Sequence, residues 1–195
     1  MTAAGLVGSE SVWYLMRATG VVSLVLLTAV VVLGLATVNR WRPGRRPRFV
    51  TTALHRNLSL LAVAFVAVHV VTAVVDPYAM VSVAAVFVPF VGARGALWVG
   101  LGALSIDLIL ALIVSSLFRG RVGPRLWRAL HWLAYLAWPA ALAHGLGLGT
   151  DASTFWLRGT AGACAALVGL ALAVRLWPRG SAKRLEPQPA LKAAA

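Results

Sequence analysis

The chain has 195 residues, of which 61% are hydrophobic and only 12% are charged. A soluble domain of this size could not bury so much apolar surface, so the composition excludes an ordinary water-soluble protein and indicates that lipid is the main solvent. The net charge of +13 would suggest nucleic acid as the partner of a soluble protein. Here the basic residues lie mostly between apolar segments, so we expect membrane lipid and no nucleic acid as partner.

Five segments are long and apolar enough to cross a hydrocarbon core about 30 Å thick. The first has no basic residue before Arg17 and is too long for the apolar part of a signal peptide, so we expect it to remain as a helix. The sequence therefore predicts an all-α integral membrane protein, a bundle of five transmembrane helices. In chain order, these segments cover residues 14–38, 55–75, 96–118, 127–148 and 155–177.

Basic residues are unevenly distributed among the connections. They gather after the first segment, between the third and fourth, and at the C-terminal end, whereas only Arg17, Arg94 and Arg158 fall on the other side. Because cytoplasmic connections are enriched in lysine and arginine, we expect the N-terminus outside and the C-terminus in the cytoplasm. Frequent alanine, valine, leucine and arginine suggest a GC-rich bacterium, and hence a multi-pass protein of the bacterial cell membrane.

The outer connection, residues 76–95, is apolar but short, and Pro89 interrupts it. We expect it to lie at the interface or to re-enter the membrane rather than to span it. Residues 178–195 mix proline, charge and alanine without an apolar period, which is typical of disorder. The sequence thus predicts one membrane domain over residues 1–177 and a disordered cytoplasmic tail over residues 178–195.

All four histidines lie in two of the predicted membrane helices, His55 and His69 in one, His131 and His144 in the other. An ionisable side chain inside a membrane is costly and usually marks a function. His55 and His69 are separated by about 21 Å along their helix and project from nearly one face. Because the two helices run in the same direction, His55 and His131 are expected near the cytoplasmic side and the other two near the outer side.

The second pair is spaced differently. Thirteen residues separate His131 from His144, which on a regular helix turns their side chains about 140° apart. Pro139 lies between them and is expected to kink the helix and disturb its winding. Whether this proline brings both histidines to one face cannot be decided from the sequence.

One imidazole from each of two helices, at each of two levels, suits a planar haem with two axial ligands. Zinc fits less well, since no carboxylate or thiolate accompanies the histidines. We therefore predict two b-type haems, with the four histidines as iron ligands. The single cysteine, Cys164, excludes covalent CxxCH attachment and is expected to pack in the core.

Two arginines stand beside the cytoplasmic-side histidines. Arg56 and Arg128 could bind haem propionates, or they could simply hold the helix ends at the cytoplasmic surface. Asp107 lies in the middle of the third predicted helix, where a carboxyl group must be protonated, paired or facing a polar cavity. It could serve a proton path or contact a quinone, or it could bond to a neighbouring helix. The glycines of 100-GLG-102 permit close approach of helices or haem.

Several motifs along the chain share one resemblance. They are 17-RATG, 54-LHR, His69, 76-DPYAM, 97-LWVGLG, 127-WRALHWLAYLAW and 144-HGLGLGTD. This pattern, over about residues 10–177, resembles the ferric reductase-like transmembrane domain family. The family includes the membrane cores of NADPH oxidases and iron reductases, and the haem-binding subunit of a bacterial methionine sulfoxide reductase system. The resemblance implies one haem between His55 and His131 at the cytoplasmic side, and another between His69 and His144 at the outer side.

The chain also departs from the larger members of that family, which carry a cytoplasmic flavin- and nicotinamide-binding reductase after the last helix. Only a short segment follows Pro178, without a glycine-rich phosphate loop. We therefore expect no flavin or NAD(P) site in this chain, a separate electron donor, either a flavin reductase or quinol, and an outer-side acceptor protein or substrate.

Three functions are open at this stage. The leading hypothesis is a di-haem electron-transfer protein that serves as the haem-binding subunit of an oxidoreductase. The second is a quinol-linked cytochrome b subunit. The third is a non-redox transport or assembly subunit that uses histidines for protons or helix pairing.

Overall fold

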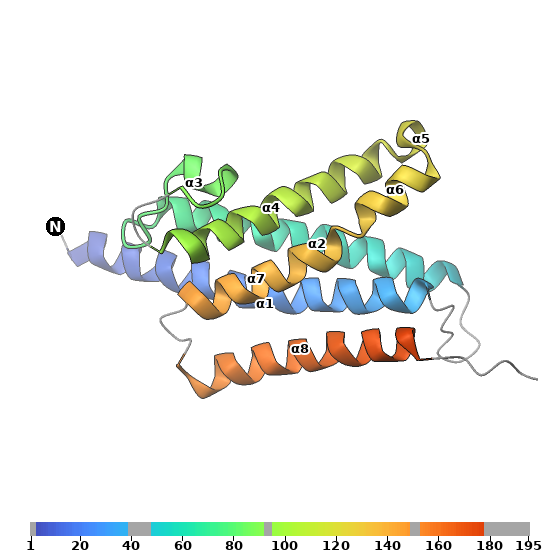
Figure 1. The fold of residues 1–195 in the computed structure, drawn as a ribbon. Helices are drawn as coiled ribbons and strands as arrows, with labels where there is room; N and C mark the ends of the chain where they lie inside the picture. The colour runs from blue at the N-terminus through green and yellow to red at the C-terminus, as the bar shows by residue number, and fades with distance from the viewer. Residues whose placement is uncertain (1–2, 39–47, 92–94, 149–152, 178–195) are drawn as a thin grey trace, which may run out of the picture.

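The structure is a computed structural model that describes residues 3–38, 48–91, 95–148 and 153–177. Within these ranges every regular element is an α-helix, which confirms the predicted all-α class. The expected disordered tail lies outside the described residues. The helices, shown in Figure 1, are α1 (Ala3–Val38), α2 (Arg48–Val75), α3 (Val83–Phe87), α4 (Ala96–Leu117), α5 (Arg119–Val122), α6 (Pro124–His131), α7 (Ala134–Leu148) and α8 (Phe155–Leu176).

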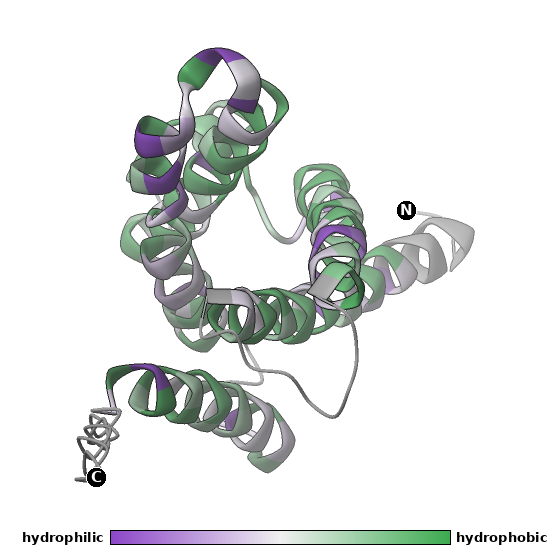
Figure 2. Cartoon of the chain, turned by 90° about the vertical axis from the view of Figure 1, so that its right-hand side faces the viewer, coloured by the Kyte–Doolittle hydropathy of each residue, from purple (hydrophilic) through white to green (hydrophobic). Residues whose placement is uncertain are grey.

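Four of these helices are long and apolar enough to cross a membrane: Glu10–Thr37, Phe49–Val75, Ala96–Leu117 and Phe155–Leu176. Large apolar side chains point outward along them, for example Leu60, Val71 and Leu170, each more than 60% exposed. In Figure 2 the long helices are mostly hydrophobic, with few hydrophilic residues along them, and hydrophilic residues gather at α5 and α6. Helices that are apolar all round are stable when lipid covers them, so the chain is a multi-pass membrane protein.

The long helices lie side by side and alternate in direction (Figure 1). The helices α1, α4 and α8 run one way, and α2 and the α6–α7 pair run the opposite way. The closest packing is between α1 and α2 and between α4 and α7, while α1 also contacts α7 and α8. The start of α1 and the end of α8 therefore lie at opposite ends of the bundle.

The predicted fourth membrane helix, 127–148, is not one continuous helix, so the predicted count of five transmembrane helices is not confirmed. It is divided between α6 and α7, because the backbone changes its hydrogen bonding at Trp132 and Leu133. Trp132 N donates to Ala129 O at 3.1 Å, and Leu133 N donates to Leu130 O at 2.9 Å. These bonds span three residues instead of four, as in a 3₁₀-helix. Pro139 lies inside α7, beyond this change in winding.

The apolar connection after α2 does not cross the bundle. Its only regular element in the described part is α3, whose five residues are too few to span a membrane. Ser82 caps α3 by accepting a hydrogen bond from Ala85 N at 3.2 Å. The segment lies beside the start of α4, where Phe90, with a φ of 66°, contacts Gly100 so closely that no side chain would fit there.

The buried face of α1 carries hydroxyl groups that need no partner on another helix. Thr19, Ser23 and Thr28 are all buried, and each donates to a carbonyl one turn earlier in the same helix, as in the 2.7 Å bond from Ser23 Oγ to Thr19 O. Bonding within the helix removes the cost of placing these polar groups in an apolar core. Thr28 also accepts a 2.9 Å hydrogen bond from Trp138 Nε1, which joins α7 to α1.

Candidate cofactor site

The four histidines meet in two pairs between α2 and the α6–α7 segment. The ring centroids of His55 and His131 are 6.4 Å apart, and those of His69 and His144 are 6.2 Å apart. All four side chains are half-buried. Apart from these ring pairs, the backbone of α2 is not packed closely against α6 or α7. The structure therefore pairs His55 with His131 and His69 with His144, the same histidines that the sequence predicts at equal depth in the membrane.

Backbone carbonyls orient three of the four rings. His69 Nδ1 bonds to Met16 O at 2.8 Å, His144 Nδ1 bonds to Trp98 O at 2.8 Å, and His55 Nδ1 bonds to Val30 O at 3.1 Å. Because a carbonyl oxygen can only accept, each Nδ1 must carry the proton. In a neutral imidazole this leaves Nε2 unprotonated, and an unprotonated ring nitrogen is the form that binds a metal.

Each acceptor carbonyl is followed, four residues later, by a glycine that faces the same ring. A Cβ on Gly20 would lie 2.9 Å from the His69 ring, and a Cβ on Gly102 would lie 2.5 Å from the His144 ring. A Cβ on Gly34 would lie 3.4 Å from the His55 ring. The missing side chains let the rings approach the helix backbone closely enough to bond to it. We refer to Met16/Gly20, Val30/Gly34 and Trp98/Gly102 as the carbonyl–glycine pairs.

His131 is supported differently. Its Nδ1 is buried and has no hydrogen-bond partner in the part of the chain that the structure describes. Its ring instead lies against the ring of Trp127, with a centroid distance of 4.8 Å and an interplanar angle of 33°. Trp127 Nε1 in turn donates to Ser116 Oγ at 3.4 Å. Among the described residues, His131 is thus held by packing against a tilted aromatic ring and not by a backbone acceptor.

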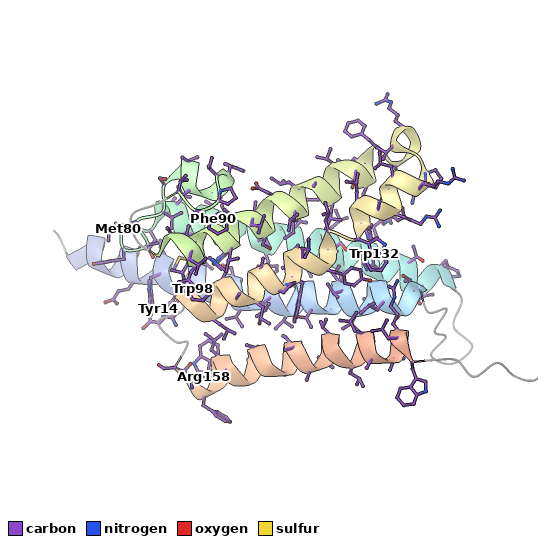
Figure 3. All side chains as sticks on the ribbon, in the orientation of Figure 1. Tyr14, Met80, Phe90, Trp98, Trp132 and Arg158 are labelled. Atoms are coloured by element: carbon purple, nitrogen blue, oxygen red, sulfur yellow. The ribbon has the colours of Figure 1, made fainter. Side chains whose placement is uncertain are left out.

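The two pairs occupy different levels of the bundle. Figure 3 places Trp98, whose carbonyl accepts from His144, toward the end where α1 begins and where Phe90 and Tyr14 also lie. Trp132, which follows His131, lies nearer the opposite end. The arginines of α5 and α6 are at this second end (Figure 1), so the His55–His131 pair is the one close to the basic end.

The distances within the pairs agree with a shared metal ion. A metal–imidazole bond is about 2 Å long, and a ring nitrogen lies roughly 1.1 Å from its ring centre, so rings on opposite sides of one ion have centroids roughly 6 Å apart. Among the described residues no three metal-binding side chains meet. A bare ion would then have two protein ligands, whereas a haem brings the remaining ligands in its macrocycle. The histidine pairs therefore fit haem.

The predicted propionate partners are both exposed. Arg56 follows His55 on α2, and Arg128 on α6 donates from Nε to Pro124 O at 3.0 Å. Their binding to propionates stays a prediction. Asp107 is half-buried within α4, and Cys164 is buried in α8, as expected for a packing residue. Arg17 lies over the ring of Trp13, 4.2 Å from its centroid.

Sequence reasoning identified the four histidines but missed most of what holds them. The carbonyls of Met16, Val30 and Trp98 have no signature in the sequence, because every residue carries a carbonyl. One signal was available: Gly20 and Gly34 have the same fourteen-residue spacing as His55 and His69. Two antiparallel helices whose interacting residues are equally spaced can contact each other at two levels. The equal spacing of these glycines and histidines therefore indicates that α1 contacts the two histidines of α2.

A comparison with protein families identifies the family to which the chain belongs. The family model described as ferric reductase like transmembrane component matches residues 19–142. The match covers more than half of the chain, includes His55, His69 and His131, and ends just before His144. It confirms the resemblance that the motifs indicated. Comparisons with curated proteins and with solved structures gave no match.

Proposed function

Since the chain belongs to the ferric reductase-like transmembrane component family, we propose that it carries electrons across a bacterial cell membrane through two b-type haems. His55 and His131 bind one, and His69 and His144 bind the other. The observation that carries this proposal is the pairing of rings at 6.4 and 6.2 Å, with three Nδ1 atoms bonded to carbonyls. A haem bound at each pair supplies reversible one-electron chemistry at its iron.

The residues around the pairs prepare the ligands for this task. The carbonyls of Met16, Val30 and Trp98 fix the tautomer and the plane of three rings and make these ligands more basic. Gly20 and Gly102 keep the rings of His69 and His144 against the helix backbone. Ligands held in this way need little rearrangement when the charge at the site changes, which favours fast electron transfer.

The direction of transfer follows from the proposed topology. Five crossings result if α6 and α7 together form one, and the arginines of α5 and α6 then mark the cytoplasmic end. The N-terminus lies outside in this arrangement, the His55–His131 site is the inner one, and the His69–His144 site is the outer one. A membrane potential that is negative inside favours outward electron movement by about 2.3 kcal/mol per charge per 100 mV.

Donor and acceptor are separate molecules in this proposal. The donor is a flavin reductase or a quinol, and the acceptor is a protein or substrate at the outer side. Asp107 favours the quinol, because a half-buried carboxyl group within a membrane-length helix can accept a proton as a quinol is oxidised. A quinol analogue should then reduce the protein in proteoliposomes, and the D107N variant should be slower. Reduction by a soluble reductase alone would support the flavin donor.

Haem content tests the proposed function directly. The protein purified in mild detergent should show two low-spin b-type haems per chain in reduced-minus-oxidised spectra and in a pyridine haemochrome assay. The H69Q and H144Q variants should each lose the outer haem, and H55Q and H131Q the inner one. N57A, on the exposed side of α2, is the matched control and should retain both. A colourless protein that hemin cannot reconstitute would instead favour the transport or assembly hypothesis.

A further inference from the structure

The fourth histidine has no carbonyl–glycine pair, and α4 explains why. The Trp98/Gly102 pair supports His144 at one level of α4. Fourteen residues further along the same helix, the equivalent positions are Leu112 and Ser116. This is the spacing at which the pairs repeat on α1. Leu112 and Ser116 are therefore the residues where a fourth pair, facing His131, would be expected.

The position that differs from the other pairs is 116. The carbonyl of Leu112 accepts a hydrogen bond from Ser115 Oγ at 3.1 Å, but this does not exclude a histidine, because Met16 O accepts one from Thr19 Oγ1 at 3.0 Å and still bonds to His69. Ser116 has a hydroxymethyl group where the other pairs have glycine, and its Oγ accepts from Trp127 Nε1 at 3.4 Å. The indole of Trp127 thus binds to α4 where the His131 ring would otherwise bind. The Arg119 guanidinium, 5.9 Å from the centre of the Trp127 ring, lies over the same indole.

Trp127 is also well placed to orient His131. It precedes His131 by four residues on α6, so the two side chains lie on the same face of the helix. Their rings are in contact, with centroids 4.8 Å apart. The buried His131 Nδ1 has no partner among the described residues, so packing against the indole is the interaction that sets the plane of the ring.

We infer that Trp127 is a positioning residue for His131, and that the Trp127–Ser116 contact replaces the fourth carbonyl–glycine pair. The consequence for electron transfer rests on the proposed function. Both ligands of the outer site bond to carbonyls, but only His55 does so at the inner site. A ligand without that bond is less basic and stabilises oxidised iron less. Because His131 lacks this bond, the midpoint potential of the inner site is higher than it would be if both of its ligands were bonded to carbonyls.

The first test measures the hydrogen bonding of Nδ1 in each histidine. The full chain, labelled with ¹⁵N-histidine in lipid nanodiscs and reduced with dithionite, should show three Nδ1–H protons in strong hydrogen bonds, with His131 as the exception. Single His→Gln variants assign the signals. W127L should shift the signals of His131 alone, W127F should shift them less, and W177F, in an exposed tryptophan, should shift none. A strongly hydrogen-bonded His131 Nδ1–H, or one unaffected by W127L, would overturn the inference.

The second test builds the missing pair. The S116G variant removes the side chain at position 116 and leaves the Leu112 carbonyl able to accept a second donor, as Met16 O does. It should create a fourth strongly bonded Nδ1–H and lower the midpoint potential of the inner haem, leaving the outer haem unchanged. Equal shifts of both haems, or no shift, would count against the inference. The NMR signals are measurable with or without haem, so missing haem would refute the proposed function without deciding the role of Trp127.

Discussion

The backbone of α1 and α4 acts as part of the site. A histidine that binds a metal through Nε2 needs a second partner at Nδ1 to hold its ring. In most proteins a carboxylate or a loop carbonyl can serve, but a charged partner would be costly within a membrane. Here helix carbonyls serve, at 2.8–3.1 Å. Glycine inside a helix costs about 1 kcal/mol relative to alanine, so three such glycines against three histidine rings indicate a requirement for close approach.

Substituting these glycines should affect the two levels unequally. In G20A and G102A the new methyl group would overlap the ring of His69 or His144. We expect loss of about 1–3 kcal/mol of stability, a typical cost of overpacking, together with loss of the outer haem. G34A should be milder, because its Cβ would lie at 3.4 Å from His55, near ordinary contact. Thermal unfolding and haem content per chain measure both effects.

The control for this series is G145A. Gly145 is next to His144 in the chain, and a Cβ there would meet nothing within 4 Å. This variant should keep both haems and should be at least as stable as the parent protein, because alanine favours helix more than glycine does. If G145A lost the outer haem as G102A does, the contact argument would be wrong.

The sequence predicts the histidines but not their supports. His55, His69, His131 and His144 could be found because imidazole is rare in membrane helices, and their levels followed from helix direction. The role of Trp127 could not be found, since an aromatic residue near a membrane surface is expected for general reasons. Choosing among such residues requires knowing which ring lacks a hydrogen bond, and that depends on the contacts between helices.

The α6–α7 junction resolves the unequal spacing of the histidines. A regular helix turns about 100° per residue, and a 3₁₀ segment turns about 120°. Bonds that span three residues run from Ala129 to Leu136. About five tighter steps after His131 add roughly 100°, which reduces the offset between His131 and His144 from about 140° to about 40°. This equals the offset of His55 and His69, so both pairs can face each other.

Sequence periodicity could not have located this junction. It correctly marks residues 127–148 as an apolar segment, and it correctly identifies a mismatch between thirteen and fourteen residues. Pro139 was the natural candidate for the cause, because proline removes a backbone donor. The change instead lies at Trp132 and Leu133, where no residue type marks it. The residues of the junction also contact other helices, and such contacts cannot be predicted from the periodicity of a single segment.

One such contact comes from α8. Arg175 Nη1 donates to the hydroxyl of Tyr135 at 2.9 Å, and its guanidinium lies 5.1 Å from the centre of the Trp132 ring. We expect the R175M and Y135F variants each to lower stability by about 1 kcal/mol, the usual net value of a hydrogen bond. Together they should cost less than their sum, because both remove the same bond. Thermal unfolding of the two single variants and the double variant gives the coupling energy, and additive effects would contradict it.

At the scale of the whole molecule, the orientation in the membrane is the main prediction. Ser82, before α3, and Gly120, in α5, lie at opposite ends of the bundle (Figure 1). In a C164A background, S82C should react with a membrane-impermeant maleimide on intact cells. G120C should react only after the cells are permeabilised. The parent chain, whose Cys164 is buried, is the control, and the reverse labelling pattern would mean that the inner and outer sites are exchanged.

The distribution of the carbonyl–glycine pairs has a consequence for how the protein is made. Both histidines of α2 are bonded to α1, whereas His144 is bonded to α4 and His131 packs against Trp127 of its own helix, α6. The helical hairpin of α1 and α2 leaves the ribosome first and can orient its two imidazoles before the rest of the chain is synthesised. The second half can do the same on its own. Under the proposed function, binding of haem adds to the contacts of α1 with α7 and α8 in joining the two halves, and cells starved of iron should accumulate an inserted precursor that proteases degrade faster than the haem-bound protein.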